Sequence, residues 1–229
     1  VPSGSSAAPG SVPPLFASFV DDASLLRPDG GLGVDTVVEG YLDTRDGDHG
    51  GLLGRLVCPV SRLSPLVTEL ARSAPAAPVE LALVVDSGLG SVPKALSTVF
   101  SRATLLTPRT VETSAPVDLD PVWLERVAEF VPDDVTAVVE PRRPITGDAD
   151  DVAAWLDAVR RVAENRCEPK LRCGGPRASD VPAVDEVQRF LAIAAETGRA
   201  VAVVGLSRLV RSADEAGTMQ HGILNLLVA

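Results

Sequence analysis

Residues 135–173 read VTAVVEPRRPITGDADDVAAWLDAVRRVAENRCEPKLRC, and this stretch decides the fold. An apolar, β-branched run opens it at 135–140, a helical pattern follows at 149–165, and a second short run closes it at 169–173. In the helical part, apolar residues recur at intervals of three and four, with Asp and Arg on the other side, as in an amphipathic helix. A strand, a helix and a second strand of these lengths are typical of a unit that joins parallel strands.

The same rhythm extends in both directions from this unit. Short apolar runs predict six strands, at 52–60, 79–86, 103–110, 135–140, 169–173 and 200–205. The patterns between them predict helices at 61–73, 92–102, 121–131, 149–165 and 184–198, and the last ends on Gly198, a typical C-cap residue. Runs such as 81–85 and 135–139 are apolar on both faces, which indicates strands of a parallel sheet that are covered on each side.

These units predict an α/β fold, and we favour a (β/α)8 TIM-type barrel with short or irregular first and last units. Residues 16–23 are expected to form the first strand and residues 223–228 the last. An open doubly wound parallel sheet is the alternative; against it, no GxGxxG follows a strand and no P-loop is present. Residues 1–14, rich in Ser, Gly, Pro and Ala, are expected to be a flexible leader before a single domain at 15–229.

The composition argues against several classes of function. With 31 acidic and 21 basic side chains, the net charge of -10 argues against a general nucleic-acid binder. No apolar run is long enough for a transmembrane helix, so no membrane partner is expected. Cys58, Cys167 and Cys173 lack metal-type spacing and predict free thiols in a cytoplasmic protein. We expect neither a metal nor another cofactor, and homo-oligomerisation stays open.

Polar residues near the ends of the predicted strands form the candidate site, because a barrel carries its chemistry at the C-terminal ends of its strands. In the run at 169–173 and the glycines after it, alternation places Lys170, Arg172 and Gly174 on one face, with Leu171 and Cys173 on the other. Arg172 is expected to hold an anionic group of the substrate.

Lys170 is the most informative single residue. Only two of the 21 basic residues are lysines, Lys94 and Lys170. A lysine inside a strand is a candidate for Schiff-base or general-base chemistry. Glu140, on the neighbouring strand, is predicted to pair with it or to carry its proton. The alternative is a structural Lys170–Glu140 ion pair in the interior of the barrel.

The remaining candidates are weaker. Gly174 and Gly175 offer backbone N–H groups to an anion, although a plain βα turn explains them better. Cys58, with no histidine near it in sequence, is expected to be a small buried thiol and not a nucleophile. Further substrate-binding candidates at strand ends are Asp86, Arg109, Arg142, Ser207 and Arg208.

Four segments carry a resemblance: FVDDASLLRP at 19–28, VCPVSRL at 57–63, KLRCGG at 170–175 and HGILNLLVA at 221–229. They resemble a family of uncharacterised actinobacterial proteins of barrel type, and the resemblance spans most of the chain. That family carries a lysine early in the strand at 200–205 and a His-His pair after it, where this chain has Val201, Ser207 and Arg208. The strand with Lys170 before a double glycine also resembles the Schiff-base strand of deoxyribose-phosphate-type aldolases.

The leading hypothesis is a metal-independent barrel enzyme that acts on a small, anionic, carbonyl-bearing metabolite. Lys170 would form an iminium or act as a base, and Glu140 would move the proton, in lyase, isomerase or cyclase chemistry. The departures from the family pattern indicate a divergent copy recruited to another substrate, in specialised-metabolite biosynthesis. The alternative is a non-catalytic barrel that binds a ligand or a protein partner.

Overall fold

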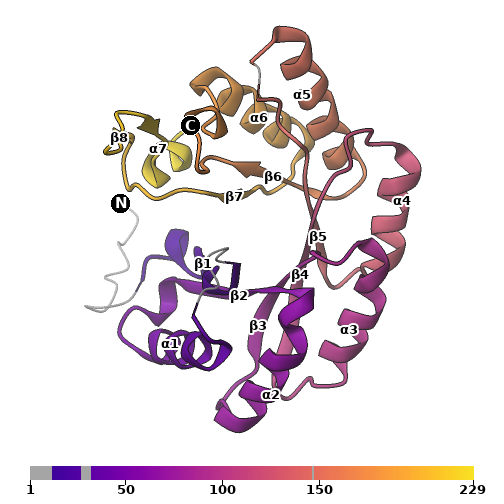
Figure 1. Ribbon diagram of the computed structural model, residues 1–229, viewed down its shortest axis with the longest axis vertical. Helices are drawn as coiled ribbons and strands as arrows, with labels where there is room; N and C mark the ends of the chain where they lie inside the picture. Colours follow the sequence, from indigo (N-terminus) through magenta and orange to yellow (C-terminus); the bar gives the residue numbers. More distant parts are fainter. Residues whose placement is uncertain (1–11, 27–31, 146) are drawn as a thin grey trace, which may run out of the picture. The chain divides into compact units, whose positions relative to one another are not determined.

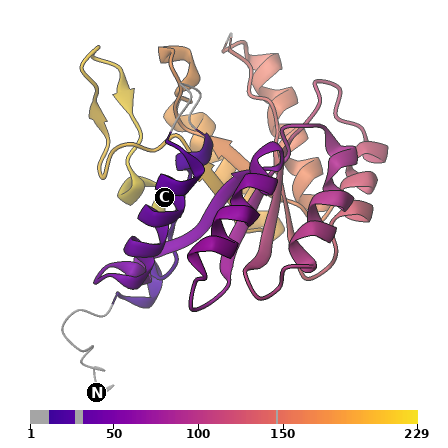
Figure 2. The ribbon, with the colours of Figure 1, turned by 60° about the horizontal axis from the view of Figure 1, so that its bottom comes forward.

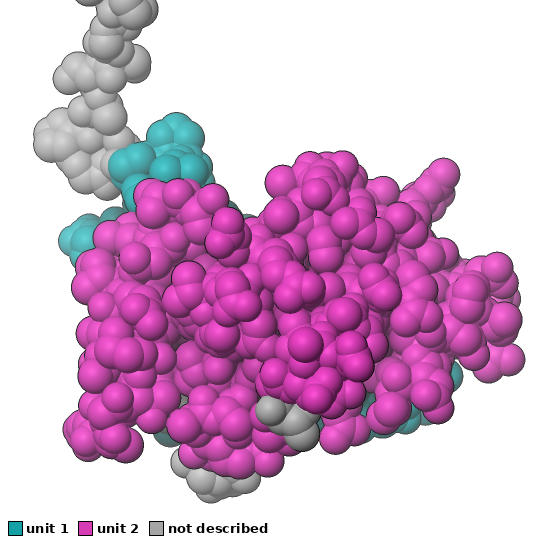
Figure 3. All heavy atoms as spheres, turned by 90° about the horizontal axis from the view of Figure 1, so that it is seen from above, with its two compact units in different colours: residues 1–111 teal, residues 112–229 magenta. Residues whose placement is uncertain are grey.

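The computed structural model describes residues 12–26, 32–145 and 147–229. Backbone proximity divides the chain into two compact units, residues 1–111 (unit 1) and 112–229 (unit 2), which Figure 3 colours teal and magenta. Of the leader expected at 1–14, only residues 12–14 fall within the described residues. The expectation of a single domain at 15–229 stays a prediction.

The described residues of unit 1 form three complete strands and three α-helices. The strands are β1 (Val20–Asp22), β2 (Leu53–Pro59) and β3 (Val79–Val84), followed by the first part of β4 (Leu106–Ser114). The helices are α1 (Val34–Asp46), α2 (Leu63–Ser73) and α3 (Val92–Phe100). Hydrogen-bonded neighbours follow the chain order β1-β2-β3-β4, and the β1–β2 and β2–β3 pairs are parallel.

Unit 2 begins inside β4 and continues with three strands, β5 (Thr136–Glu140), β6 (Glu168–Arg172) and β7 (Ala202–Val204). Neighbours again follow the chain order β4-β5-β6-β7, and the β5–β6 and β6–β7 pairs are parallel. The helices are α4 (Pro121–Phe130), α5 (Ala149–Glu164) and α6 (Val184–Thr197). The chain ends with the hairpin β8–β9 (Ser212–Ala213, Met219–Gln220), yellow in Figure 2, and α7 (Ile223–Leu227).

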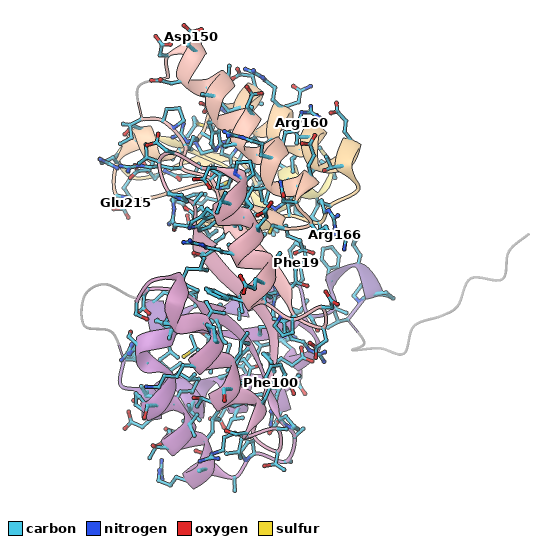
Figure 4. All side chains as sticks on the ribbon, turned by 90° about the vertical axis from the view of Figure 1, so that its right-hand side faces the viewer. Phe19, Phe100, Asp150, Arg160, Arg166 and Glu215 are labelled. Atoms are coloured by element: carbon cyan, nitrogen blue, oxygen red, sulfur yellow. The ribbon has the colours of Figure 1, made fainter. Side chains whose placement is uncertain are left out.

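Helices α5 and α6 lie side by side against one face of β6 and β7 (Figure 1). Helix α5 begins where the Asp148 side chain accepts a hydrogen bond from the Asp150 backbone N–H, at 2.9 Å, which satisfies a free donor of its first turn. Trp155 of α5 stacks on Phe190 of α6, with ring centroids 5.9 Å apart. The side of α5 and α6 that faces the solvent is polar, and there Arg160 of α5 forms an ion pair with a carboxylate of α6. Figure 4 labels Asp150 and Arg160 along α5.

The expectation of an α/β fold on a parallel sheet is confirmed. Each predicted strand from 16–23 to 200–205, and each predicted helix from 61–73 to 184–198, overlaps an observed element. The strand expected at 223–228 is wrong, because these residues form α7, and Leu226 packs against the core beneath α5 and α6. The parallel sheet of the described residues has seven strands, and closure into a (β/α)8 ring stays a prediction.

The packing of α6 generates a stability prediction. Phe190 is fully buried, so Phe190→Ala should lower the free energy of unfolding of unit 2 by about 3–5 kcal/mol, through lost apolar contact and the cavity left behind. Val184→Ala, at an exposed position of the same helix, should change it by less than about 0.5 kcal/mol. Urea denaturation followed by tryptophan fluorescence measures both, since Trp123 and Trp155 both belong to unit 2. Equal losses for the two variants would contradict this core.

Candidate functional site

Strand β6 divides its side chains between two different environments. Leu171 and Cys173 belong to the apolar core shared with α5 and α6. Lys170 and Arg172 alternate with them and therefore lie on the opposite face of the sheet. The alternation expected from the sequence is confirmed. We call this opposite face, defined by Glu112 of β4, Glu140 of β5, and Lys170 and Arg172 of β6, the charged face.

Lys170 is paired with Glu112, a residue that the sequence did not single out. The Lys170 Nζ lies 2.5 Å from the Glu112 Oε2, and the two side chains are only 11% and 8% exposed. Because β4 runs on to Ser114, Glu112 lies inside the strand; the prediction ended that strand at Thr110. A buried ammonium and a buried carboxylate at this distance neutralise each other where neither would be stable alone.

The sequence predicted that Glu140 would pair with Lys170. In the structure Glu140 binds Arg172 instead. The Arg172 Nε and Nη2 donate to the two oxygens of Glu140 at 2.7 and 3.0 Å. A planar guanidinium matches both oxygens of a carboxylate, which a single ammonium cannot do. This hydrogen bond is the main cause that raises the pKa of Arg172 above its usual value, and the Arg172 side chain remains 51% exposed.

Asp86 and Arg109 belong to unit 1, and each has a local partner there. Asp86 accepts hydrogen bonds from the backbone N–H of Ser61, at 3.1 Å, and from its hydroxyl group, so it ties the segment after β2 to the end of β3. Arg109 was expected at the end of a strand, but it lies within β4, where it is exposed and binds Glu80 at 2.9 Å. The strand-end position predicted for Arg109 is therefore wrong.

Arg142 is exposed just beyond the end of β5, and its neighbour Arg143 is the residue that the structure uses. The Arg143 Nη1 lies 3.0 Å from the Glu186 Oε2, both side chains are largely buried, and Arg143 also donates to the carbonyl of Ser179. Glu186 in turn accepts from the Ala183 N–H at 2.6 Å, where it caps α6. The sequence analysis assumed strand alternation up to Arg142, but β5 ends at Glu140.

The glycines after β6 meet other parts of unit 2 at close range. A Cβ on Gly174 would lie 2.5 Å from the Gly205 carbonyl oxygen, and Gly205 has a φ of +81°, a conformation that favours glycine. A Cβ on Gly175 would lie 2.5 Å from a carboxylate oxygen of Asp180. This close packing gives both positions a structural reason for glycine, and Gly175 faces a carboxylate, which is unfavourable for a bound anion.

Ser207 and Arg208 follow β7 in the same region. Ser207 is exposed, and Arg208 is half-buried and forms an isolated parallel bridge with Gly222. The Arg208 Nε is buried and has no hydrogen-bond partner among the described residues. His221, next to that bridge, is buried, and its Nε2 lies 2.7 Å from the Pro182 carbonyl oxygen.

The three cysteines are buried and unpaired. Burial raises the pKa of the Cys58 and Cys173 thiols to about 12 and that of Cys167 to about 11. A thiol that keeps its proton at neutral pH is a poor nucleophile and a poor metal ligand. Among the described residues, no group of three or more His, Cys, Asp or Glu side chains is arranged to hold a metal ion. No helix in the described part of the chain is long and apolar enough to cross a membrane.

Two comparisons with known proteins bear on the identity of the chain. No protein-family model matches the chain, and no curated protein matches it.

The Lys170–Glu112 pair generates a double-mutant prediction. Lys170→Met should destabilise unit 2 by about 3–5 kcal/mol, because it leaves a buried carboxylate without a cation. Combining it with Glu112→Leu should bring stability back to within about 1 kcal/mol of the starting protein, since no unpaired charge remains. Arg172→Met, at the half-exposed pair, should cost less than about 1 kcal/mol. Denaturant titration of these three variants and of the Glu112→Leu single variant measures the coupling, and additive losses for Lys170 and Glu112 would contradict the pair.

Proposed function

We propose that the protein is an enzyme that uses the Lys170 amine to activate a small, carbonyl-bearing anion. The observation that carries the proposal is the contact of 2.5 Å between the Lys170 Nζ and the Glu112 Oε2 on the charged face, with both side chains nearly buried. A carboxylate at hydrogen-bond distance can take a proton from the ammonium and return it later, which amine catalysis requires. Glu112 thus takes the proton-carrying role first expected of Glu140.

The first covalent step balances with these two residues alone. Glu112 accepts a proton from the Lys170 ammonium, and the neutral amine adds to the carbonyl carbon to give a carbinolamine. The protonated Glu112 then returns its proton to the carbinolamine hydroxyl, which leaves as water. One ammonium and one carbonyl have become one iminium and one water, and the positive charge is conserved. Lyase, isomerase and cyclase reactions can each proceed from this iminium, because it withdraws electrons from the adjacent carbon.

Arg172 is suited to hold the anionic group of the substrate. Its Nε and one of its Nη atoms bind Glu140, and half of its side chain is exposed, so N–H groups of a guanidinium with five donors remain for a ligand. Glu140 is then a positioning residue, which fixes the plane of the guanidinium. The proposal keeps the barrel-type arrangement and the cytoplasmic setting expected from the sequence, and three unpaired buried thiols agree with a reducing compartment.

One observation favours a second candidate, a non-catalytic protein that binds an anionic ligand. Lys170 is only 11% exposed, as expected of a structural ion pair that no substrate reaches. In that case Arg172, which is more exposed, would be the ligand-binding residue and Lys170 would support the strand beneath it. The two candidates differ in whether a carbonyl compound reaches the Lys170 amine.

Reductive trapping tests the proposal. Incubation with pyruvate and sodium cyanoborohydride should attach the probe to Lys170, and peptide mass spectrometry should locate it there and not on Lys94. Lys94 is an internal control, because it is an exposed lysine of α3 and the only other one in the chain. Lys170→Arg should remove the labelling while preserving the positive charge beside Glu112, since a guanidinium does not form an iminium.

Two other labelling results would exclude the proposed amine chemistry. If Lys94 and Lys170 are labelled to the same low extent, or if Lys170 is not labelled with pyruvate or with larger oxo acids, the amine chemistry is excluded. The ligand-binding candidate then takes first place. Circular dichroism of the Lys170→Arg protein verifies that any loss of labelling does not come from unfolding.

A further inference from the structure

The hairpin β8–β9 of unit 2 is held in a fixed shape at both of its ends. In its loop, the Asp214 carboxylate accepts a hydrogen bond from the backbone N–H of Thr218 at 2.9 Å. At its base, the backbone N–H of Arg211 donates to the Asn225 Oδ1 of α7 at 2.7 Å. An ordered surface loses little conformational freedom when a partner binds it, so the hairpin is suited to form a contact.

The two faces of this hairpin differ in exposure. Ser212 and Gln220 form one cross-strand pair, and both are half-buried. Ala213 and Met219 form the other pair, and both are exposed. A two-stranded hairpin is only marginally stable by itself and normally needs a further strand or layer. The face that carries Ala213 and Met219 is where such a layer can be added.

Apolar side chains gather on the surface of this part of the chain. The described residues of unit 2 include nine exposed large apolar side chains, and five of them lie between residues 209 and 228. Leu209 and Val210, which lead into β8, are 64% and 54% exposed, and Met219 is 41% exposed. Single exposed apolar residues are common, but a group of them marks an interaction site.

The charge of this segment selects the kind of partner. Residues 207–229 hold two basic and two acidic side chains and are neutral, so residues 1–206 carry the whole net charge of -10. Two copies of the chain therefore repel each other through most of their length and not through this segment. A strongly charged partner would gain no net attraction from it. An apolar, neutral surface on an acidic chain thus fits a second copy of the same chain.

Two opposite charges mark the ends of the hairpin. Arg211 is exposed at its base, and Glu215 is exposed at its tip, where Figure 4 labels it. A two-fold axis applies one surface to itself, so the charges of that surface must complement each other. When two such hairpins lie antiparallel, each Arg211 meets Glu215 of the second copy, and the contact is attractive at both ends.

We propose that the hairpin β8–β9 is a homodimer contact, in which two copies pack their exposed hairpin faces across a two-fold axis near Ala213. Met219 lies in the apolar centre of this contact, and Arg211 and Glu215 pair across it. One hairpin face and its base offer less than the roughly 800 Å² per partner of a standard interface, so the dimer is weak, with a Kd in the micromolar range or above. The inference goes beyond the proposed function and does not depend on it.

Sedimentation velocity of the full chain, from micromolar to millimolar protein, tests the contact. The starting protein should pass from monomer to dimer as its concentration rises. Met219→Asp should raise the Kd at least ten-fold, because it places a carboxylate from each copy in the apolar centre. Val122→Asp is the matched control, since Val122 is also exposed but lies on α4, and it should leave the Kd unchanged.

A charge exchange tests the two-fold arrangement. Arg211→Glu and Glu215→Arg should each raise the Kd roughly five-fold or more, because every altered charge meets a like charge twice in the dimer. The double variant restores opposite charges and should bring the Kd back close to that of the starting protein. Arg126→Glu and Glu125→Arg, exposed on α4, make the same changes in net charge and should have no effect. Circular dichroism verifies that each variant is folded.

Three results would overturn the proposal. The first is a protein that stays monomeric over the whole concentration range, including one that binds phosphatidylcholine vesicles, because the apolar surface would then take lipid and not a second copy. The second is a dimer that Met219→Asp leaves intact. The third is a double charge variant that associates no better than the weaker of the two single variants.

Discussion

A lysine placed in the middle of a strand and removed from water must have a negative partner, and the charged face of unit 2 is organised by this requirement. Lys170 satisfies it with Glu112, and the two side chains are almost equally buried. Arg172, two residues further along β6, has its own carboxylate in Glu140. Each cation thus has one carboxylate, while the apolar side chains that alternate with them pack under α5 and α6. One face of β6 thus packs in the apolar core, and the other face carries the charged side chains.

The partner of Lys170 also shows how the sheet brings distant residues together. The strand order is β4-β5-β6, so Glu112 and Lys170 stand on strands that are separated by β5, about 10 Å apart at the usual spacing. The two side chains meet because both are long and extend over the same face of β5. The neighbouring carboxylate, Glu140, is left for the guanidinium of Arg172, which binds both of its oxygens.

The periodicity of the sequence predicted the elements well and the charge partners poorly, for a physical reason. Apolar alternation and helical spacing report burial, so they located β2 to β7 and α2 to α6, and they placed Lys170 and Arg172 on one face. They failed where a strand continues through polar residues: Thr110, Glu112 and Thr113 are buried, but nothing apolar marks them except Val111. Likewise, the hairpin β8–β9 is held by hydrogen bonds to the Asp214 side chain, which leave no periodic pattern.

The ion pair on which the charged face depends joins Lys170 to Glu112, and not to Glu140. Nitrogen-15 labelling of lysine tests it directly by NMR, because the chain has only two lysines and hence two side-chain amines. A buried, hydrogen-bonded ammonium exchanges its protons slowly, so Lys170 should give an observable Nζ–H signal and the exposed Lys94 should not. The account predicts that Glu112→Gln removes or strongly shifts this signal while Glu140→Gln leaves it in place. A signal that survives Glu112→Gln and disappears in Glu140→Gln would contradict it.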